Sequence, residues 1–189
     1  CNRLVEMGAE VHALVRSLKS PRTNVPDGVV VWPWTGAFSD VASLFREIGS
    51  RSPVVVHLAA QTTLNYPHKD EELNSLVEAN FTLGLCLLEA AGTFGCKKLI
   101  NTGSYWQYSQ GPLPCSNSIY AATKNAFDQL VNYYVLQRQF VVITLVLTDV
   151  YGPNDFPGKV LNQLIRHDQM DQDFEVTFGE QKLNFVHID

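Results

Sequence analysis

The sequence predicts an α/β fold, a doubly wound parallel sheet with helices on both of its faces. Segments typical of strands alternate with segments typical of helices along most of the chain. The strand segments are nearly continuous apolar runs, as in strands that are buried on both faces. Strands and helices in this alternation form parallel sheets whose crossover connections are right-handed.

The first half of the chain carries three predicted strands and two predicted helices. The first helix ends at Gly8, because glycine tolerates the left-handed conformation that often follows a helix. Ser39 or Asp40 is the expected cap of the second helix. The expected elements are a helix at residues 2–7, strands at 10–16 and 29–32, a helix ending at 48 and a strand at 53–60.

The second half continues the alternation with two long helices. Apolar residues recur at spacings of three and four along the first of them, which indicates one buried helix face. Ser118 is the expected cap of the other. The expected elements are a helix at residues 70–94, a strand at 98–102, a helix at 118–137 and a strand at 141–147.

Several polar or small residues lie at the C-terminal ends of predicted strands or just beyond them. These are Arg16, Ala60, Ser104 and Asp149. In a doubly wound sheet, ligands bind in the crevice beyond the carboxyl ends of the strands. The sequence therefore predicts one ligand site to which four separate loops contribute.

The pattern changes after Gly152 and Pro153. A helix is expected at residues 157–169, and short strands are expected at 174–178 and 182–186. We interpret residues 1–153 as one domain and residues 154–189 as the start of a smaller second domain.

Composition excludes several classes of protein. The chain has 189 residues, 46% apolar and 17% charged, with a net charge of −5. The acidic excess and the lack of a block rich in Lys and Arg argue against a nucleic-acid partner. The longest apolar run, residues 140–147, is too short to cross a membrane, so a cytoplasmic protein is expected. The four cysteines stand far apart without a Cys-x-x-Cys pair, and no metal site is predicted.

Tyr120 and Lys124 lie four residues apart at the start of a predicted helix. At this spacing the phenol and the ammonium share one helix face. A cation near a phenol favours the phenolate and lowers its pKa, which suits proton exchange with a carbonyl or an alcohol. The alternative is a solvated helix face that happens to carry an aromatic residue and a lysine.

Other stretches support the chemical interpretation, and with them the sequence resembles the extended short-chain dehydrogenases/reductases, a group of nucleotide-sugar epimerases, dehydratases and reductases with a Rossmann-like fold. The matching positions follow the order of that family and cover nearly the whole chain. They are residues 57–60, Asn80, residues 102–104 with Tyr108, residues 120–124, residues 150–153 and residues 184–189.

The resemblance implies a role for each matching position. Tyr120 would be the acid–base group, Lys124 would lower its pKa and bind the nicotinamide ribose, and Ser104 would hold the substrate oxygen. Asn80 would support the proton path from behind the site and also lie near the cofactor. The remaining positions are expected along the cofactor (Ala59, Ala60 and Val150) or at the substrate (Gln61, Tyr105 and Asp149).

Two features bear on the cofactor. Arg16, followed by Ser17, stands where the family places a residue that reads the adenosine ribose, and an arginine there accommodates the 2′-phosphate of NADP. NADP is therefore expected, with NAD possible; a solvated arginine is the alternative. The first strand and the glycine-rich loop that cradles the pyrophosphate are expected ahead of Cys1.

The resemblance also narrows the reaction. Tyr105 and Trp106 occupy the positions where the dehydratases carry an Asp-Glu pair, so dehydration is disfavoured. The residues from 102 to 108 and from 151 to 155 are similar to those of 4-keto-6-deoxyhexose reductases of the CDP-abequose synthase group. We therefore expect a reductase of a nucleotide-linked sugar, with a nucleotide-sugar epimerase or a catalytically silent dinucleotide-binding protein as alternatives. The resemblance further implies a homodimer formed through the two long helices.

Overall fold

The computed structural model describes most of the chain. The described residues are 1–16, 25–49, 51–63, 66–109, 111–153, 155, 158–173, 175, 178, 180 and 182–188. They form two compact units, Cys1–Leu145 and Val146–Asp189, and each unit is described by itself.

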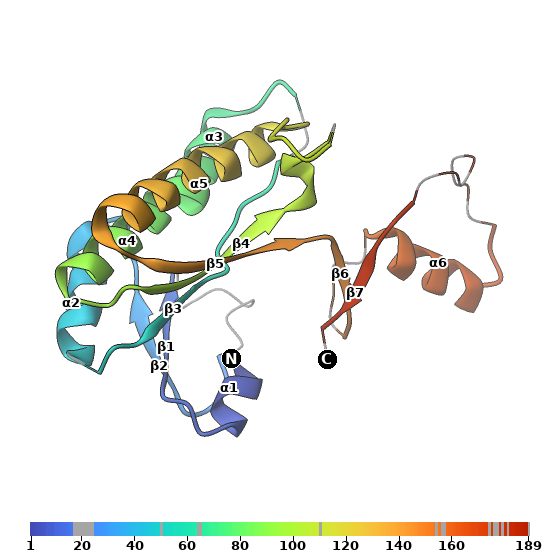
Figure 1. Cartoon of the computed structure of the whole chain (residues 1–189). Coiled ribbons are helices and arrows are strands. Elements are labelled where there is room, and N and C mark those ends of the chain that lie inside the picture. The colour runs from blue at the N-terminus through green and yellow to red at the C-terminus, as the bar shows by residue number, and fades with distance from the viewer. Residues whose placement is uncertain are drawn as a thin grey trace. The chain divides into compact units, whose positions relative to one another are not determined.

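The strands of the first unit are parallel where their pairing is described (Figure 1). One pair consists of β1 (Val11–Val15) and β2 (Val29–Pro33). A second sheet has the order β3-β4-β5, formed by β3 (Val54–His57), β4 (Lys98–Ser104) and β5 (Val141–Leu147). The prediction of an α/β fold with parallel strands is confirmed.

The helices of the first unit connect these strands. The Ser118 hydroxyl caps the longest helix, α5, by accepting a hydrogen bond from the Ala121 main-chain nitrogen at 3.2 Å, as the sequence predicts. The cap expected for α2 is wrong: this helix begins at Phe38, and the Asp40 carboxylate accepts hydrogen bonds from Thr35. The helices are α1 (Asn2–Glu6), α2 (Phe38–Ile48), α3 (Asp70–Val77), α4 (Leu83–Thr93) and α5 (Ile119–Arg138).

The helical region at residues 70–94 is not one regular α-helix. A π-helical turn, η1 (Glu78–Thr82), separates α3 from α4. In a π turn the main-chain hydrogen bonds span five residues, and such turns are frequent at functional sites. Asn80 lies inside this turn.

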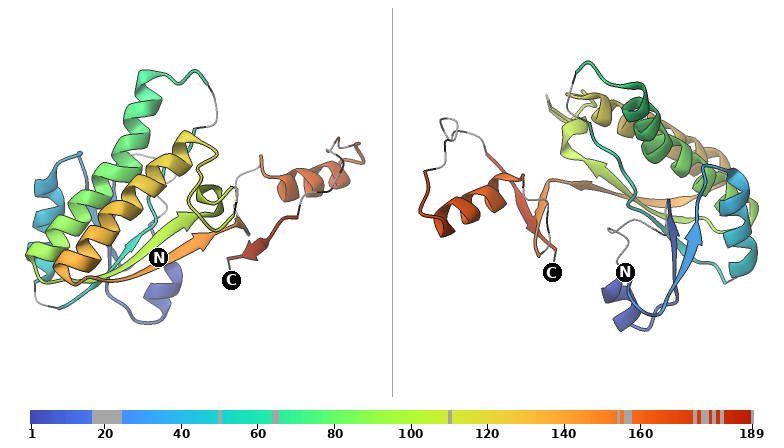
Figure 2. Two further views of the ribbon diagram at one scale, coloured as in Figure 1. Left: turned by 45° about the horizontal axis from the view of Figure 1, so that its top comes forward. Right: turned by 180° about the vertical axis from the view of Figure 1, so that it is seen from behind.

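Helices α2, α4 and α5 enclose the main core with one face of the sheet. Figure 2 shows α4 and α5 side by side over the strands. Gly84 of α4 lies against the ring of Phe127 of α5, and a Cβ atom at Gly84 would stand 2.3 Å from that ring. The glycine therefore permits the close approach of the two helices.

The expectation that β3 is buried on both faces is wrong. Its residues alternate between the two faces of the sheet. Val55 packs against the main core, whereas the side chains of Val54 and Val56 are 51% and 43% exposed. The described helices that form this core cover only the face to which Val55 belongs.

The second unit contains a parallel strand pair and one helix. Strand β6 (Asp149–Tyr151) pairs with β7 (Phe185–His187), and α6 (Val160–Gln169) occupies the predicted helical region. Most of the strand expected at residues 174–178 lies outside the described residues. In neither unit does a described helix have the length and apolar character needed to cross a membrane.

Candidate active site

Ser104 and Tyr120 come from different elements and meet at one end of the sheet. Ser104 is the last residue of β4, and Tyr120 lies in the first turn of α5. Burial raises the pKa of the Tyr120 phenol, while a hydrogen bond with the Ser104 side chain acts in the opposite direction. The Ser104 Oγ also accepts a hydrogen bond from the Trp106 main-chain nitrogen at 3.3 Å, within the 3₁₀ turn η2 (Tyr105–Gln107).

Lys124 lies one turn after Tyr120 on α5, and its side chain is only 3% exposed. Its Nζ donates a hydrogen bond to the Thr102 main-chain carbonyl at 2.9 Å. Burial lowers the pKa of the Lys124 ammonium, and the Asp128 carboxylate opposes this change. Because burial and Ser104 account for the shift of Tyr120, the lowering of its pKa that we expected from Lys124 is not seen here.

Asn80 joins the loop after β3 to the helix that carries Tyr120. Its side chain is 1% exposed and bonds the main chain of Gln61 twice, accepting from the nitrogen at 2.8 Å and donating to the carbonyl at 2.9 Å. Its Nδ2 also donates to the Thr123 hydroxyl at 3.0 Å. Asn80 thereby holds the exposed segment formed by Ala59, Ala60 and Gln61 next to α5.

His57 is a buried neighbour of this cluster. Its ring lies edge-on to Phe127, with ring centroids 5.2 Å apart. Burial lowers the pKa of His57 to about 4, and the Lys124 ammonium acts in the same direction. The neutral imidazole therefore forms part of the wall behind Lys124.

Aromatic side chains border the phenol of Tyr120. The Trp106 ring lies nearly perpendicular to the Tyr120 ring, with centroids 5.9 Å apart. Tyr105 stacks edge-on to Trp106 and is partly exposed. These aromatic rings limit the approach of water to Tyr120 from one side.

Arg16 lies at the end of β1 and is held by residues of α3 and η1. It donates a hydrogen bond to the Ser75 hydroxyl at 3.0 Å, and its guanidinium lies 3.7 Å from the Glu78 carboxylate. Ser17, which we expected to bind the cofactor beside Arg16, lies outside the described residues.

Asp149 and Val150 belong to the second unit, where both lie on β6. The Val150 main-chain carbonyl accepts a hydrogen bond from the Lys159 ammonium, which also pairs with Asp155 at 2.8 Å. Within this unit Asp149 aligns with Phe185 of β7.

Sequence reasoning missed two polar residues next to Ser104, the buried Gln107 and the partly buried Asp128. Gln107 and Asp128 bond each other, and Gln107 also bonds the Ser104 main chain. Asp128 could have been found, because it lies four residues after Lys124 and therefore on the same helix face. Gln107 carries no such signal.

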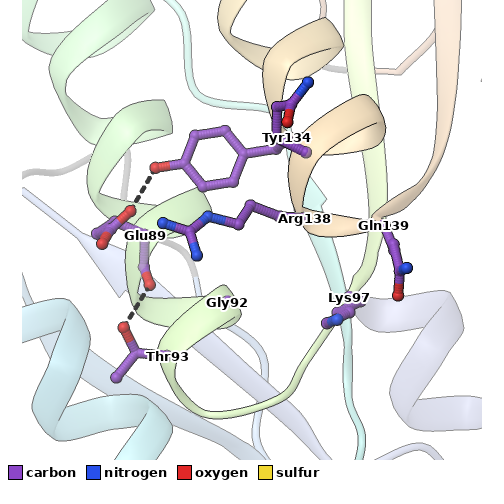
Figure 3. A pocket seen from close by; sticks show the side chains of 8 residues that line it. Glu89, Gly92, Thr93, Lys97, Tyr134, Arg138 and Gln139 are labelled. Carbon is purple, nitrogen blue, oxygen red and sulfur yellow. Dashed lines mark hydrogen bonds between the residues drawn. The ribbon is translucent and has the colours of Figure 1, made fainter.

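A pocket of about 400 Å³ lies elsewhere, between the C-terminal ends of α4 and α5 (Figure 3). Lys97, Arg138 and Glu89 line it, and the Tyr134 hydroxyl donates to the Glu89 carboxylate. Lys97 directly precedes β4 and Ser104 ends it, so the pocket and the candidate site lie at opposite ends of that strand. No group of His, Cys, Asp and Glu side chains in the described parts of the chain could hold a metal ion.

The arrangement suits polar chemistry at a single oxygen atom. The Ser104 hydroxyl acts on the pKa of the Tyr120 phenol, and a buried ammonium lies one helical turn away. The neighbouring residues Ala59, Ala60 and Gln61 are exposed. Such a site can bind an oxygen of a ligand, donate a proton to it and stabilise negative charge on it.

Comparisons with known proteins agree with this chemistry. The model of the NAD dependent epimerase/dehydratase family matches residues 1–189. A CDP-abequose synthase of Yersinia pseudotuberculosis is 29% identical over 154 residues, which cover 78% of this chain and 51% of the relative. A CDP-abequose synthase of Salmonella typhimurium is 26% identical over 189 residues, which cover 98% of this chain and 60% of the relative. The chain thus spans between half and 60% of the length of these curated relatives.

Solved structures show the same fold. The Thermus thermophilus UDP-glucose 4-epimerase in complex with NAD has a TM-score of 0.76 and 26% identity, covering 98% of this chain and 65% of that one. The UDP-glucose 4-epimerase of Thermotoga maritima with UDP-glucose has a TM-score of 0.83 and 19% identity, covering 98% and 64%. These likenesses confirm the prediction of a Rossmann-like fold.

Proposed function

Because this chain belongs to the NAD dependent epimerase/dehydratase family, we propose that the protein is an NADPH-dependent reductase of a nucleotide-linked 4-keto-6-deoxyhexose. The observation that carries the proposal is the proximity of Ser104, at the end of β4, to Tyr120, at the start of α5, with the buried ammonium of Lys124 one turn further along α5.

In the proposed reaction, the substrate carbonyl oxygen binds between Ser104 and Tyr120. The nicotinamide, when bound, supplies the hydride to the carbonyl carbon. Ser104 donates a hydrogen bond to the oxygen as negative charge develops there, and Tyr120 donates the proton that completes the alcohol. The raised pKa of Tyr120 keeps its phenol protonated at neutral pH, as a proton donor must be.

Lys124 and Asn80 support this step in different ways. We place the nicotinamide ribose beside the Lys124 ammonium, whose hydrogen bond to Thr102 directs it toward the end of β4. Asn80 fixes the segment of Ala59, Ala60 and Gln61, along which we place the cofactor. Gln61 and Tyr105 have exposed side chains near this edge and would contact the sugar. We propose further contacts from Asp149 to the sugar and from the Val150 main chain to the nicotinamide.

Two observations favour a reductase that uses NADP. Arg16 at the end of β1 offers a guanidinium for the 2′-phosphate, beside Ser17, and the curated relatives include proteins named CDP-abequose synthase. An epimerase is the second candidate, because solved structures of this fold include UDP-glucose 4-epimerases. A silent binding protein has no chemical need for Ser104, Tyr120 and Lys124 together.

We also propose a homodimer in the cytoplasm. The dimer would form through α3, α4 and α5, where the described residues Val77 and Leu136 are 47% and 75% exposed although apolar. The four free cysteines suit a reducing compartment.

The test is the replacement Tyr120→Phe in the complete protein, assayed for NADPH oxidation with nucleotide-linked 4-keto-6-deoxyhexoses. Turnover should fall by about 10²- to 10⁴-fold because the proton donor is lost, while the affinity for NADPH stays within about twofold. Tyr133→Phe on the same helix is the control and should leave turnover unchanged. Retained turnover in Tyr120→Phe would contradict the mechanism.

A further inference from the structure

A cluster of buried and partly buried amide and carboxylate side chains lies next to the turn that follows Ser104. Its members come from β4, η2 and α5, and Gln107 at its centre is 0% exposed. None of these side chains has a role in the proposed chemical step. They are Asn101, Gln107, Asn125 and Asp128.

Gln107 connects the main chain of Ser104 to α5. Its Oε1 accepts a hydrogen bond from the Ser104 nitrogen at 2.7 Å. Its Nε2 donates to Asn125 Oδ1 at 2.8 Å and to Asp128 Oδ2 at 2.7 Å. Both amide hydrogens and the carbonyl oxygen are therefore used, and the three partners together permit only one orientation of the side chain.

Asp128 anchors this arrangement from the face of α5 that also carries Tyr120 and Lys124. Besides Gln107, its carboxylate accepts a hydrogen bond from Asn101 Nδ2 at 3.1 Å. Burial raises the pKa of Asp128, and the bond to Gln107 and the charge of Lys124 act in the opposite direction. Asp128 in turn favours the charged form of Lys124. One carboxylate is thus linked both to Gln107, which bonds the Ser104 main chain, and to the charge of Lys124.

We propose that Gln107 and Asp128 are positioning residues that hold the Ser104 hydroxyl at a fixed position relative to the Tyr120 phenol. This inference rests on the proposed function, since the oxygen that Ser104 and Tyr120 share is the reacting one. Gln107 acts on Ser104 through its main chain, and Asp128 fixes Gln107 to the helix on which Tyr120 lies. Gln107 and Asp128 thereby fix the distance between the Ser104 hydroxyl and the Tyr120 phenol without contacting the substrate themselves.

The first test does not depend on activity. In the complete protein without substrate, we measure hydrogen exchange of the Ser104 amide in the unaltered chain and in Gln107→Met, which keeps the side-chain length. Loss of the acceptor should accelerate exchange about tenfold or more. Unchanged protection of the Ser104 amide would overturn the inference. If Gln107→Met fails to fold, Asp128→Asn serves for the same measurement, and exchange of the Ser104 amide should again be faster because Gln107 loses its anchor on α5.

The second test asks whether the positioning matters for catalysis. Asp128→Asn keeps one acceptor oxygen but places its amide donor against the donor of either Gln107 or Asn101, so kcat should fall about tenfold or more while KM and NADPH affinity stay within about twofold. Combining Asp128→Asn with Gln107→Glu keeps an acceptor for the Ser104 nitrogen and gives the new amide at position 128 a carboxylate to which it can donate. This pair should recover kcat to within about threefold of the unaltered protein. Glu47→Gln, an exposed charge removal on α2, is the control.

The outcomes separate this inference from the proposed function. A kcat unchanged in Asp128→Asn, or no recovery in the paired variant, overturns the positioning role. If the unaltered protein reduces no nucleotide-linked keto sugar, the proposed function fails instead, and the exchange rate of the Ser104 amide still decides whether Gln107 and Asp128 hold that residue.

Discussion

The side chain of Asn80 forms two hydrogen bonds with the main chain of Gln61, at 2.8 and 2.9 Å, across 19 residues of sequence. This pairing ties the end of β3 to the π turn between α3 and α4. A third hydrogen bond, to the Thr123 hydroxyl at 3.0 Å, extends the connection to α5. One buried amide thus sets the spacing of three elements that border the candidate site.

Replacing Asn80 by alanine should therefore destabilise the fold. Asn80→Ala leaves the Gln61 main chain and Thr123 without these partners, and the free energy of unfolding should fall by about 1–3 kcal/mol. Urea denaturation of the complete protein measures the change. Asn74→Ala, at an exposed position of α3, should change it by less than about 0.5 kcal/mol. Equal effects of the two variants would show that the Asn80 hydrogen bonds contribute nothing.

The contact between Arg16 and Glu78 predicts an effect on cofactor choice. The Glu78 carboxylate lies 3.7 Å from the guanidinium and competes with a 2′-phosphate for it. Glu78→Gln should raise the affinity for NADPH about two- to fivefold, because an exposed ion pair contributes at most about 1 kcal/mol. The affinity for NADH should hardly change, which fluorescence titration of both cofactors measures. Glu71→Gln is the matched control, and equal gains for NADPH and NADH in Glu78→Gln would refute the competition.

The buried side chain of His57 should make the protein less stable in acid. Its pKa is lowered from 6.5 to about 4, so the unfolded chain binds more protons than the folded one between these values. Above pH 6.5 the imidazole is neutral in both the folded and the unfolded protein, and the free energy of unfolding is not reduced by its titration. As the pH falls toward 4, the unfolded chain takes up a proton that the folded protein does not, and the free energy of unfolding falls by about 3 kcal/mol.

The variant His57→Leu removes this titration. Urea denaturation at several pH values between 7 and 4 should show a smaller loss of unfolding free energy in the variant than in the unaltered protein. Parallel pH dependence in the two proteins would mean that His57 is not buried in its neutral form.

Two glycines of α4 form a matched pair. A Cβ at Gly84 would stand 2.3 Å from the Phe127 ring, whereas one at Gly92 would lie 3.5 Å from Phe140, an ordinary contact. Gly84→Ala should destabilise the protein by about 1–3 kcal/mol or more through overpacking. Gly92→Ala should be neutral or should stabilise by up to about 1 kcal/mol, because alanine has the higher helix propensity. Thermal unfolding compares them, and similar midpoints would contradict the close packing of α4 on α5.

Local patterns were sufficient to predict much of this structure. The Ser118 cap and the spacing of Tyr120 and Lys124 depend on the helix alone, so the sequence could reveal them. Parallel strands followed from the alternation of apolar runs with helices. The strand predicted at residues 98–102 is present, but β4 continues two residues further, to Ser104.

Contacts with the main chain of distant segments could not be predicted. Asn80 bonds Gln61 and Lys124 bonds Thr102 through peptide groups, which every residue possesses and which leave no trace in the sequence. The π turn at Glu78–Thr82 and the role of Gln107 depend on packing between elements. The exposure of Val54 depends on which face of the sheet the helices cover, and an apolar run does not reveal this.

Net hydride transfer from NADPH to the sugar is tested by following where the hydride goes. The complete protein is incubated with a nucleotide-linked 4-keto-6-deoxyhexose and NADPH that carries deuterium at the transferable position of the nicotinamide. We expect one NADPH to be oxidised for each sugar reduced, and we expect mass spectrometry and NMR to find the deuterium at C4 of the product. A sugar altered at C4 without net consumption of NADPH, or NADPH bound without any turnover, would contradict this expectation.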